Sequence, residues 1–261
     1  MIAKERVQTA LNYQSPDITS AGFGVTIATG FRRRVPVRQF SVDPRTLLLT
    51  PGMILREMGY GGTEAPAAVQ DMVVSMLHEV KALATPSFAF VRLGGVLTQN
   101  RVRLEDGTTF TPGKIIARLL GKSQSFVLFT ATAGTAFHDY QRRVTAEGDI
   151  LRSFAVDTIG TCLVEAVCDR MELQLELEIA PLRHTNRFSP GFCGWKLAEQ
   201  RTLFNLLGGH PCGISLSDMC LMTPEKSVSG IVGLGTDVGS KLCGCQFCDR
   251  TTCSKRKRQQ A

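Results

Sequence analysis

The longest uninterrupted helical pattern in this chain runs from about Asp149 to Glu178, and a helix of that length needs a surface on which to pack. Its apolar and small residues recur every three or four positions, so one face carries Leu151, Ala155, Ile159, Cys162 and Ala166. Compact apolar strand patterns lie on either side of this helix in the sequence, at Phe126–Phe129 and at Val228–Leu234. We therefore predict an α+β fold, in which helices pack on a mostly antiparallel sheet.

The remaining elements follow from periodicity and turn residues. Strands are expected at Val25–Thr29, Val35–Phe40, Ser87–Leu93 and Cys212–Leu221, with a hairpin over Val102–Thr111 that turns at Asp106-Gly107. Helices are expected after Thr63–Pro66 and at Pro112–Leu120, Thr135–Ala146 and Leu197–Leu207. The composition changes only near Lys241, which predicts one domain over residues 1–241 and a cysteine-rich basic tail over residues 242–261.

The formal charge of +7 raises the question of nucleic-acid binding. Much of the excess lies in two short clusters, Arg32–Arg34 and Lys255–Arg258, and the second belongs to the polar tail. Clusters of this kind more often provide solubility or attract an acidic partner than contact bases, so nucleic acid is an unlikely partner. The first residues lack the apolar core of a signal peptide, and no apolar run approaches the length of a membrane span. A cytoplasmic protein without a membrane partner is expected.

A rigid loop with one permanent cation is the strongest candidate site. Arg187 is followed by Phe188-Ser189-Pro190-Gly191-Phe192-Cys193-Gly194 and by Trp195, the only tryptophan. A guanidinium is planar and stays charged, so it suits bidentate binding of a carboxylate. Pro190 fixes one backbone angle, and Gly191 allows a sharp turn or close approach to a ligand. The structural alternative is a loop that caps the following helix, with Arg187 in an ordinary salt bridge.

Two further motifs give this loop a context. Leu163-Val164-Glu165-Ala166 precedes it, and Pro224-Glu225-Lys226-Ser227-Val228-Ser229-Gly230 follows it. This order and spacing resembles the activation domain of cobalamin-dependent methionine synthase, from about Thr161 to Gly235. Residues Arg56–Tyr60 also resemble a segment of the free-standing members of that family. The family has a twisted antiparallel sheet with flanking helices, in agreement with the predicted fold.

The resemblance implies a function and a set of site residues. The chain would be a free-standing reactivation module that binds S-adenosylmethionine and supports reductive methylation of cobalamin for methionine biosynthesis. The cobalamin would be carried by a methionine synthase chain, and a flavodoxin- or ferredoxin-like protein would donate electrons. The residues implied in cofactor binding are Glu165, Arg187, Ser189, Pro190, Gly191, Phe192, Ser227 and Ser229. Whether the module counts as an enzyme, or only as a component of a methyltransferase system, stays open.

Some residues depart from the family pattern. Phe192 and Cys193 replace the tyrosine and second proline of the arginine motif, and Leu242-Cys243 stand where the long enzymes have two adjacent tyrosines. The implied binding mode therefore lacks a phenol hydrogen bond. Taken alone, Glu165 could be a solvated helical glutamate, and Ser227 and Ser229 could belong to a plain turn into a strand.

The tail offers a second kind of chemistry. The chain has nine cysteines, four of which fall close together at Cys243, Cys245, Cys248 and Cys253. Thiolates at this spacing can bind zinc or an iron–sulfur cluster, although the spacing matches neither a zinc ribbon nor the common ferredoxin orders. Reactive or merely structural thiols are the alternative. The alternative function is accordingly an iron–sulfur or zinc-binding electron-transfer accessory protein for another corrinoid methyltransferase.

Overall fold

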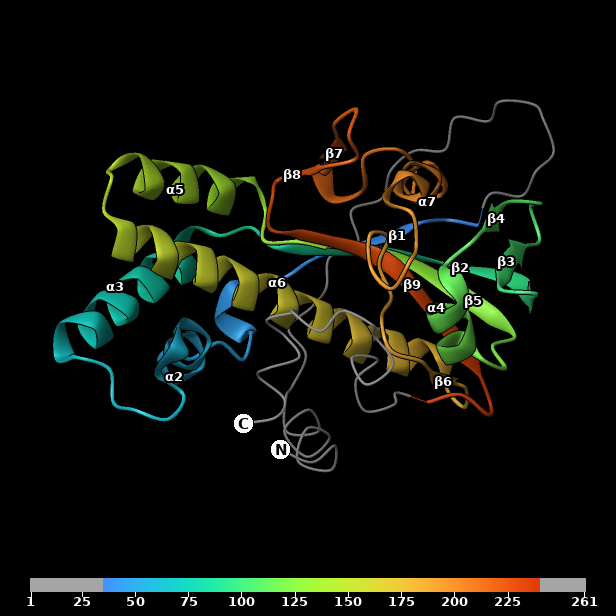
Figure 1. The fold of residues 1–261 in the computed structure, drawn as a ribbon, viewed down its shortest axis with the longest axis horizontal. Helices are drawn as coiled ribbons and strands as arrows, with labels where there is room; N and C mark the ends of the chain where they lie inside the picture. The colour runs from blue at the N-terminus through green and yellow to red at the C-terminus, as the bar shows by residue number, and fades with distance from the viewer. Residues whose placement is uncertain (1–34, 240–261) are drawn as a thin grey trace. The chain divides into compact units, whose positions relative to one another are not determined.

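A seven-stranded antiparallel sheet forms the centre of the computed structural model, which describes residues 35–239. The strand order is β4-β3-β2-β5-β9-β6, and β1 also pairs with β2 (Figure 1). The strands are β1 (Arg38–Ser41), β2 (Ser87–Thr98), β3 (Arg101–Leu104), β4 (Thr109–Phe110), β5 (Ser125–Thr132), β6 (Arg183–His184) and β9 (Ser227–Gly235). Every neighbouring pair is antiparallel, as the sequence predicts.

Strands β5 and β9 are almost entirely buried because both have strands beside them and helices over both faces. All of β5 is buried, and β9 pairs with it from Ser125↔Leu234 to Thr132↔Ser227. The long strand β2 pairs with β5 along one edge and with two strands, β1 and β3, along the other. Its first residues pair with β1, and its last residues, from Gly95 to Thr98, pair with β3.

The helices cover both faces of the sheet. They are α2 (Pro51–Leu55), the π-helical η2 (Arg56–Tyr60), α3 (Ala67–Leu83), α4 (Gly113–Leu120), α5 (Thr135–Ala146), α6 (Ile150–Ile179) and α7 (Gln200–Leu206). Short 3-10 turns are η1 (Pro44–Thr46), η3 (Leu197–Glu199) and η4 (Pro211–Gly213). On one face, α3, α5 and α6 share a core with Val127, Phe129 and Val232. On the other, α4 and α7 share a core with Phe126, Leu128 and Ile231. Figure 1 shows α6 and α7 on opposite sides of the sheet.

Helix α6 has the length that its pattern predicts and begins after a clear cap. The Asp149 carboxylate accepts hydrogen bonds from the backbone N–H groups of Leu151 and Arg152, at 2.9 Å and 3.0 Å. An aspartate at this position stabilises the first turn, because it satisfies N–H groups that have no partner inside the helix. The helix then crosses the sheet in a single span and positions every residue of the Leu163–Ala166 motif.

One predicted strand is wrong, and another begins later than expected. Residues 212–221 contain the end of η4, the two-residue strand β7 (Ser215–Leu216) and the turn that leads to its partner β8 (Met222–Thr223), because Cys212 and Cys220 have positive φ angles of 57° and 60°. These angles turn the chain and interrupt an extended strand. The strand predicted at Val35–Phe40 begins at Arg38 and continues to Ser41. The strand expected at Val25–Thr29 lies outside the described residues.

Candidate functional site

Arg187 lies on a segment fixed to strand β9 on both sides. On one side, Thr185 N donates to Gly233 O at 2.9 Å, and Gly233 N donates to Thr185 Oγ1 at 3.0 Å. On the other, Phe188 and Ile231 exchange backbone hydrogen bonds of 3.0 Å and 2.8 Å. The close approach requires a glycine at position 230, where a Cβ atom would collide with Phe188 O. The backbone around Arg187 is therefore held in place before any ligand binds.

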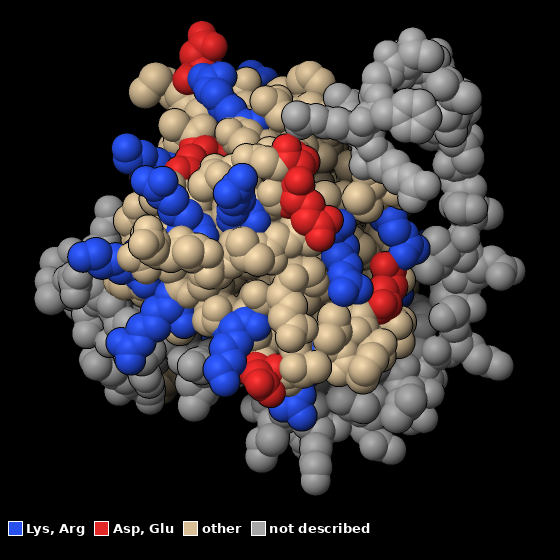
Figure 2. Space-filling model, turned by 90° about the vertical axis from the view of Figure 1, so that its right-hand side faces the viewer, with Lys and Arg blue, Asp and Glu red and all other residues tan. Residues whose placement is uncertain are grey.

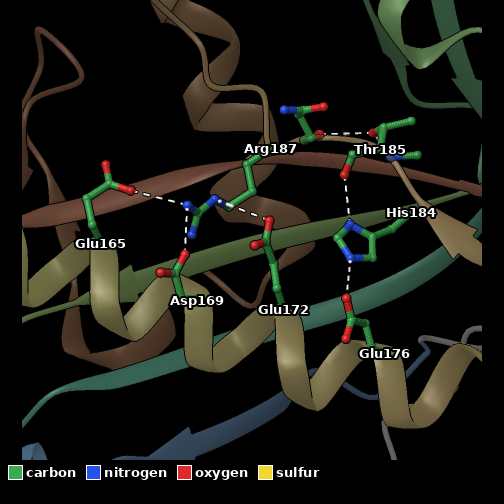
Figure 3. Close-up of polar contacts among 9 residues, drawn as sticks. Glu165, Asp169, Glu172, Glu176, His184, Thr185 and Arg187 are labelled. Carbon is green, nitrogen blue, oxygen red and sulfur yellow. Dashed lines mark hydrogen bonds and ion pairs between the residues drawn. The ribbon is translucent and has the colours of Figure 1, made fainter. Parts of the chain in front are cut away.

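The side chain of Arg187 extends to helix α6 and meets three carboxylates (Figure 3). Its Nη2 lies 3.2 Å from Glu165 Oε2 and 3.4 Å from Asp169 Oδ1, and its Nε lies 3.4 Å from Glu172 Oε1. The Arg187 side chain is 21% exposed. Its Nη1 is buried and has no hydrogen-bond partner among residues 35–239. The structure thus brings together two residues that the motifs predict, Arg187 and Glu165.

Burial and charge oppose each other in this cluster. Burial acts to lower the pKa of Arg187, but the surrounding negative groups, Glu172, Glu165 and Asp169 among them, raise that pKa above its ordinary value. Burial raises the pKa of the Glu172 carboxyl, against the lowering effect of the Arg187 charge. Burial also raises the pKa of the Cys168 thiol to about 12, so this sulfur stays a neutral thiol at neutral pH.

The sequence analysis missed Asp169 and Glu172. Together with Glu165 and Glu176 they occupy positions spaced by four, three and four residues, which places them on one face of a helix. That spacing was the available signal. Glu176 Oε1 lies 3.1 Å from His184 Nε2, and the other ring nitrogen of His184 lies 2.8 Å from Thr185 O (Figure 3). This face of α6 is an acidic stripe that the Arg183–Arg187 segment crosses.

The loop after Arg187 is closed by Trp195. Gly191, with φ of 91°, donates its N–H to Trp195 O at 2.8 Å, and Trp195 N donates to Phe192 O at 2.9 Å. The indole is 2% exposed, packs edge-on against Phe110 with ring centroids 5.9 Å apart, and donates to Glu199 Oε2 at 2.7 Å. The segment Ser189–Phe192 is consequently a rigid turn, with the Phe192 side chain 62% exposed at its tip.

Ser227 and Ser229 occupy a different environment from Arg187. Side chains alternate between the two faces of a strand, so both serines lie on the face of Ile231, opposite the face covered by α6. Ser227 Oγ lies 2.7 Å from Pro224 O and 2.8 Å from Thr132 Oγ1, and is buried. Ser229 Oγ is buried and has no hydrogen-bond partner among the described residues. The structure does not bring these serines into the Arg187–Glu165 cluster.

Comparison with known proteins places this arrangement in a family. The family model described as "Vitamin B12 dependent methionine synthase, activation domain" matches residues 96–240, which include α6, the arginine loop and β9. The chain belongs to this family. Among solved structures it is similar to one titled "Crystal Structure of the MetH Reactivation Domain bound to AdoHcy", with a TM-score of 0.59, 17% identity and coverage of 81% of each chain. No curated protein matches it.

The likeness to the MetH reactivation domain confirms the predicted α+β fold of this activation-domain family member. Neither comparison supports the alternative function as an electron-transfer accessory protein. Between residues 35 and 239, no three His, Cys, Asp or Glu side chains are arranged to hold a metal ion. None of the helices in this range combines the length and apolar character needed to cross a bilayer. The predicted thiolate ligands Cys243, Cys245, Cys248 and Cys253 lie outside the described residues, as does the domain boundary predicted near Lys241.

Proposed function

We propose that this activation-domain protein binds S-adenosylmethionine and reactivates the cobalamin of a methionine synthase chain. Family membership and the S-adenosylhomocysteine-bound structure of a relative with the same fold support this proposal. In the reaction, one electron from a donor and the methyl group of S-adenosylmethionine convert an inactive cobalt(II) cofactor into methylcobalamin, and S-adenosylhomocysteine is released. The cobalamin supplies the reactive metal, while this chain binds and orients the methyl donor.

The observation that carries the proposal is the pairing of Arg187 with Glu165 on a backbone fixed by β9. Arg187 would bind the carboxylate of the cofactor, and its buried Nη1, which has no hydrogen-bond partner within the described part of the chain, is a donor for that purpose. Because Nη1 is covered in this conformation, the side chain would have to turn on binding. Glu165 would lie near the ammonium and sulfonium charges, which need an anion when they leave water.

The turn Ser189–Phe192 supports the proposal as a rigid surface beside the ion pairs. Its backbone groups would hold the adenine and ribose, as the family resemblance implies. Ser227 and Ser229 would have an indirect role, since they support β9 from the opposite face. Ser229 Oγ is buried without a hydrogen-bond partner in residues 35–239, so this hydroxyl could still donate or accept one.

The experiment is a calorimetric titration of S-adenosylmethionine into the purified protein and into Arg187→Ala. Removing one partner of a desolvated charge pair should weaken binding by about 2–4 kcal/mol. Arg183→Ala is the matched control, because Arg183 is an exposed arginine of the same segment. Equal affinities for the wild type and Arg187→Ala would assign Arg187 a structural role, and failure of the wild type to bind would overturn the proposed function.

An acidic electron donor, such as a flavodoxin- or ferredoxin-like protein, is the proposed second partner. Exposed cations gather on β2, β3, α4 and the turn after α4, at Arg92, Arg101, Arg103, Lys114, Arg118 and Lys122. Figure 2 views the molecule from the end that carries these elements, and Lys and Arg outnumber Asp and Glu there. A basic face of this kind accelerates association with an acidic protein, most strongly at low salt.

Charge reversal at Arg101 and Arg103 tests this partner. In the double glutamate variant, a flavodoxin should reduce the cobalamin of the partner chain more slowly. The rate of this reduction should also lose most of its dependence on salt concentration. Arg142→Glu, an exposed position on α5, serves as the control for the change in net charge. If the variant and control behave alike, the basic face is not where the donor binds.

Metal binding by the four tail cysteines, Cys243, Cys245, Cys248 and Cys253, is a separate proposal. Their spacing supports binding of zinc or an iron–sulfur cluster by thiolates, and the test is the metal content of anaerobically purified protein.

A further inference from the structure

The segment that carries Arg187 pairs with β9 in two different registers. Before the arginine, His184 of β6 stands opposite Leu234. After it, Phe188 stands opposite Ile231. Between these two pairs the arginine segment advances by four residues, from 184 to 188, whereas β9 advances by three, from 234 to 231. The arginine segment therefore contains one residue more than a regular antiparallel ladder allows.

The extra residue forms a β-bulge beside the arginine. Thr185 still follows the register of β6, because its N–H donates to Gly233 O at 2.9 Å and its Oγ1 accepts from Gly233 N. Asn186 and Arg187 consequently stand together opposite the single residue Val232. Two residues opposite one is the arrangement that defines a bulge, and bulges commonly change the direction in which a side chain points.

The bulge decides which face of the sheet the arginine side chain occupies. Val232 packs in the core on the face of α6, and Ile231 packs in the core on the opposite face. In a strand that kept the register of β6, Arg187 would stand opposite Ile231 and point away from α6. With the extra residue it reaches α6, as His184 does three positions earlier (Figure 3). Side chains three positions apart do not share a face of a regular strand.

Thr185 holds the bulge through its hydroxyl group. In a regular ladder the Gly233 N–H would donate to the Thr185 carbonyl, but here it donates to Thr185 Oγ1 at 3.0 Å. The same hydroxyl donates to Asn186 O at 2.9 Å. The Thr185 carbonyl is directed to the imidazole of His184, 2.8 Å from its Nδ1. Thr185 is 1% exposed, so the hydroxyl bonds two backbone groups that solvent does not reach.

We infer that Thr185 is a positioning residue for the methyl donor, because its hydroxyl holds the bulge that turns Arg187 toward Glu165. The guanidinium is thereby presented to the carboxylate of the ligand from the face of α6. This inference rests on the proposed function and adds to it a residue outside the Leu163–Ala166 and Arg187–Trp195 motifs.

Loss of this hydroxyl should displace the arginine more than the turn that follows it. A valine at position 185 has nearly the shape of threonine but leaves the Gly233 N–H without its acceptor, so the bulge has to move. The turn Ser189–Phe192 is attached at other points, through the pairing of Phe188 with β9 and through Trp195. Contacts with the amino-acid group of the ligand should therefore depend on Thr185, whereas contacts between the turn and the adenosine should not.

The test measures the affinities of S-adenosylhomocysteine and 5′-methylthioadenosine for the wild type, Thr185→Val and Thr185→Ser by calorimetry. Both ligands contain adenosine and a thioether, and only S-adenosylhomocysteine has the amino-acid group. Thr185→Val should weaken S-adenosylhomocysteine by about tenfold, the effect of about one hydrogen bond. It should leave 5′-methylthioadenosine within about twofold of the wild type. Thr185→Ser keeps the hydroxyl and should restore the affinity for S-adenosylhomocysteine.

Thr158→Val is the matched control, because Thr158 is a buried threonine of α6 whose hydroxyl donates to Phe154 O at 2.9 Å. Its affinities for both ligands should equal those of the wild type. Wild-type protein that binds neither S-adenosylmethionine nor S-adenosylhomocysteine would overturn the proposed function and the inference with it. An unchanged affinity of Thr185→Val for S-adenosylhomocysteine, an equal loss for both ligands, or a serine variant as weak as the valine variant would overturn the inference alone. If Thr185→Val fails to fold, Thr185→Cys should show the same selective loss, because a thiol is only a weak donor and acceptor.

Discussion

Arg187 and Glu165 are 22 residues apart in the sequence and meet across 3.2 Å, from Nη2 to Oε2. Helix α6 holds the glutamate, and two backbone attachments to β9 hold the segment that carries the arginine. The pair therefore joins the sheet to the helix that covers one of its faces. Neither backbone depends on this side-chain contact for its position, because the helix and the attachments to β9 hold them independently.

Arg187→Lys should retain only part of the binding that Arg187→Ala loses. A lysine ammonium is one compact charge, whereas Arg187 contacts Glu172 through Nε and Glu165 through Nη2. We expect Arg187→Lys to weaken S-adenosylmethionine by about 1–2 kcal/mol, because it keeps the charge but loses the two-pronged geometry. Calorimetry against the wild type checks this, and a lysine variant as weak as Arg187→Ala would show that the geometry, more than the charge, controls binding.

The stability of the fold should depend on pH through Glu172. Burial raises the pKa of this carboxyl above its ordinary 4.5, although Arg187 acts to lower it. A group that binds its proton more tightly when folded stabilises the fold fully below its unfolded pKa, and that contribution is lost as the pH rises through the folded pKa. Glutamine carries no charge at any pH. The stability of Glu172→Gln relative to the wild type should therefore increase as the pH rises above the ordinary pKa of 4.5 and through the raised pKa of the folded protein.

Thermal or denaturant unfolding at several pH values measures this difference. A constant difference between Glu172→Gln and the wild type over the whole range would mean that the carboxyl titrates equally in both states. Asp169→Asn provides the comparison for loss of a half-exposed carboxylate from the same cluster, where solvent screens the charge.

Gly230→Ala should damage both the fold and the site. A Cβ at this position meets the Phe188 carbonyl oxygen and the Phe129 ring, so the arginine segment would have to move away from β9. We expect a loss of about 1–3 kcal/mol in the free energy of unfolding, together with weaker binding of S-adenosylmethionine.

The matched control for this substitution is Gly52→Ala. Nothing lies within 4 Å of a Cβ at Gly52, which is in the first turn of α2. Its unfolding free energy should stay within about 0.5 kcal/mol of the wild type, since surface changes away from special features are usually small. Equal effects of the two alanines would show that the contact between Phe188 and β9 does not constrain the arginine segment.

Trp195 offers a direct signal from the arginine loop, because it is the only tryptophan in the chain. The indole is buried, and the backbone carbonyl of Trp195 accepts a hydrogen bond from the Gly191 N–H. Its fluorescence should resemble that of an apolar environment and should change when S-adenosylmethionine binds to the Ser189–Phe192 turn. The change should be lost in Arg187→Ala. Binding seen by calorimetry without any change in fluorescence would place the ligand away from this loop.

The sequence predicts the regular parts of this structure well. Helices α3 (Ala67–Leu83), α5 (Thr135–Ala146) and α6 (Ile150–Ile179) follow from apolar spacing and terminal residues, and β5 and β9 follow from compact apolar runs. The resemblance of the motifs to the family predicts that Arg187 and Glu165 both belong to the cofactor site. The spacing of the two residues in the sequence does not show that their side chains meet. That contact depends on the path of the chain after β6.

What the sequence did not predict depends on tertiary contacts. The π-helical segment after α2 contains Gly59 at φ of 110°, which no periodic pattern reveals. Asp169 and Glu172 look like ordinary solvated acids of a helix until the arginine segment is placed across them. Ser227 and Ser229 belong to the same motif as Gly230, which contacts the Phe188 carbonyl of the arginine segment. Because side chains alternate along β9, both serines nevertheless point to the face of the sheet opposite helix α6.

The four cysteines of the predicted tail, Cys243, Cys245, Cys248 and Cys253, can be changed without touching the arginine segment. Replacing Cys245, Cys248 and Cys253 with serine should leave S-adenosylmethionine binding and the unfolding transition nearly unchanged, because these residues follow β9, the last strand within residues 35–239. The substitution should remove any bound zinc or iron, since serine is a poor ligand for soft metals. Metal analysis of anaerobically purified protein gives the baseline. Less than about 0.1 metal per chain in the wild type excludes a tight thiolate site.

Alkylation of the tail cysteines faster than that of the buried Cys168 would then identify them as reactive thiols. A triple variant that fails to fold would instead show that the tail belongs to the core, and that the predicted boundary near Lys241 is wrong.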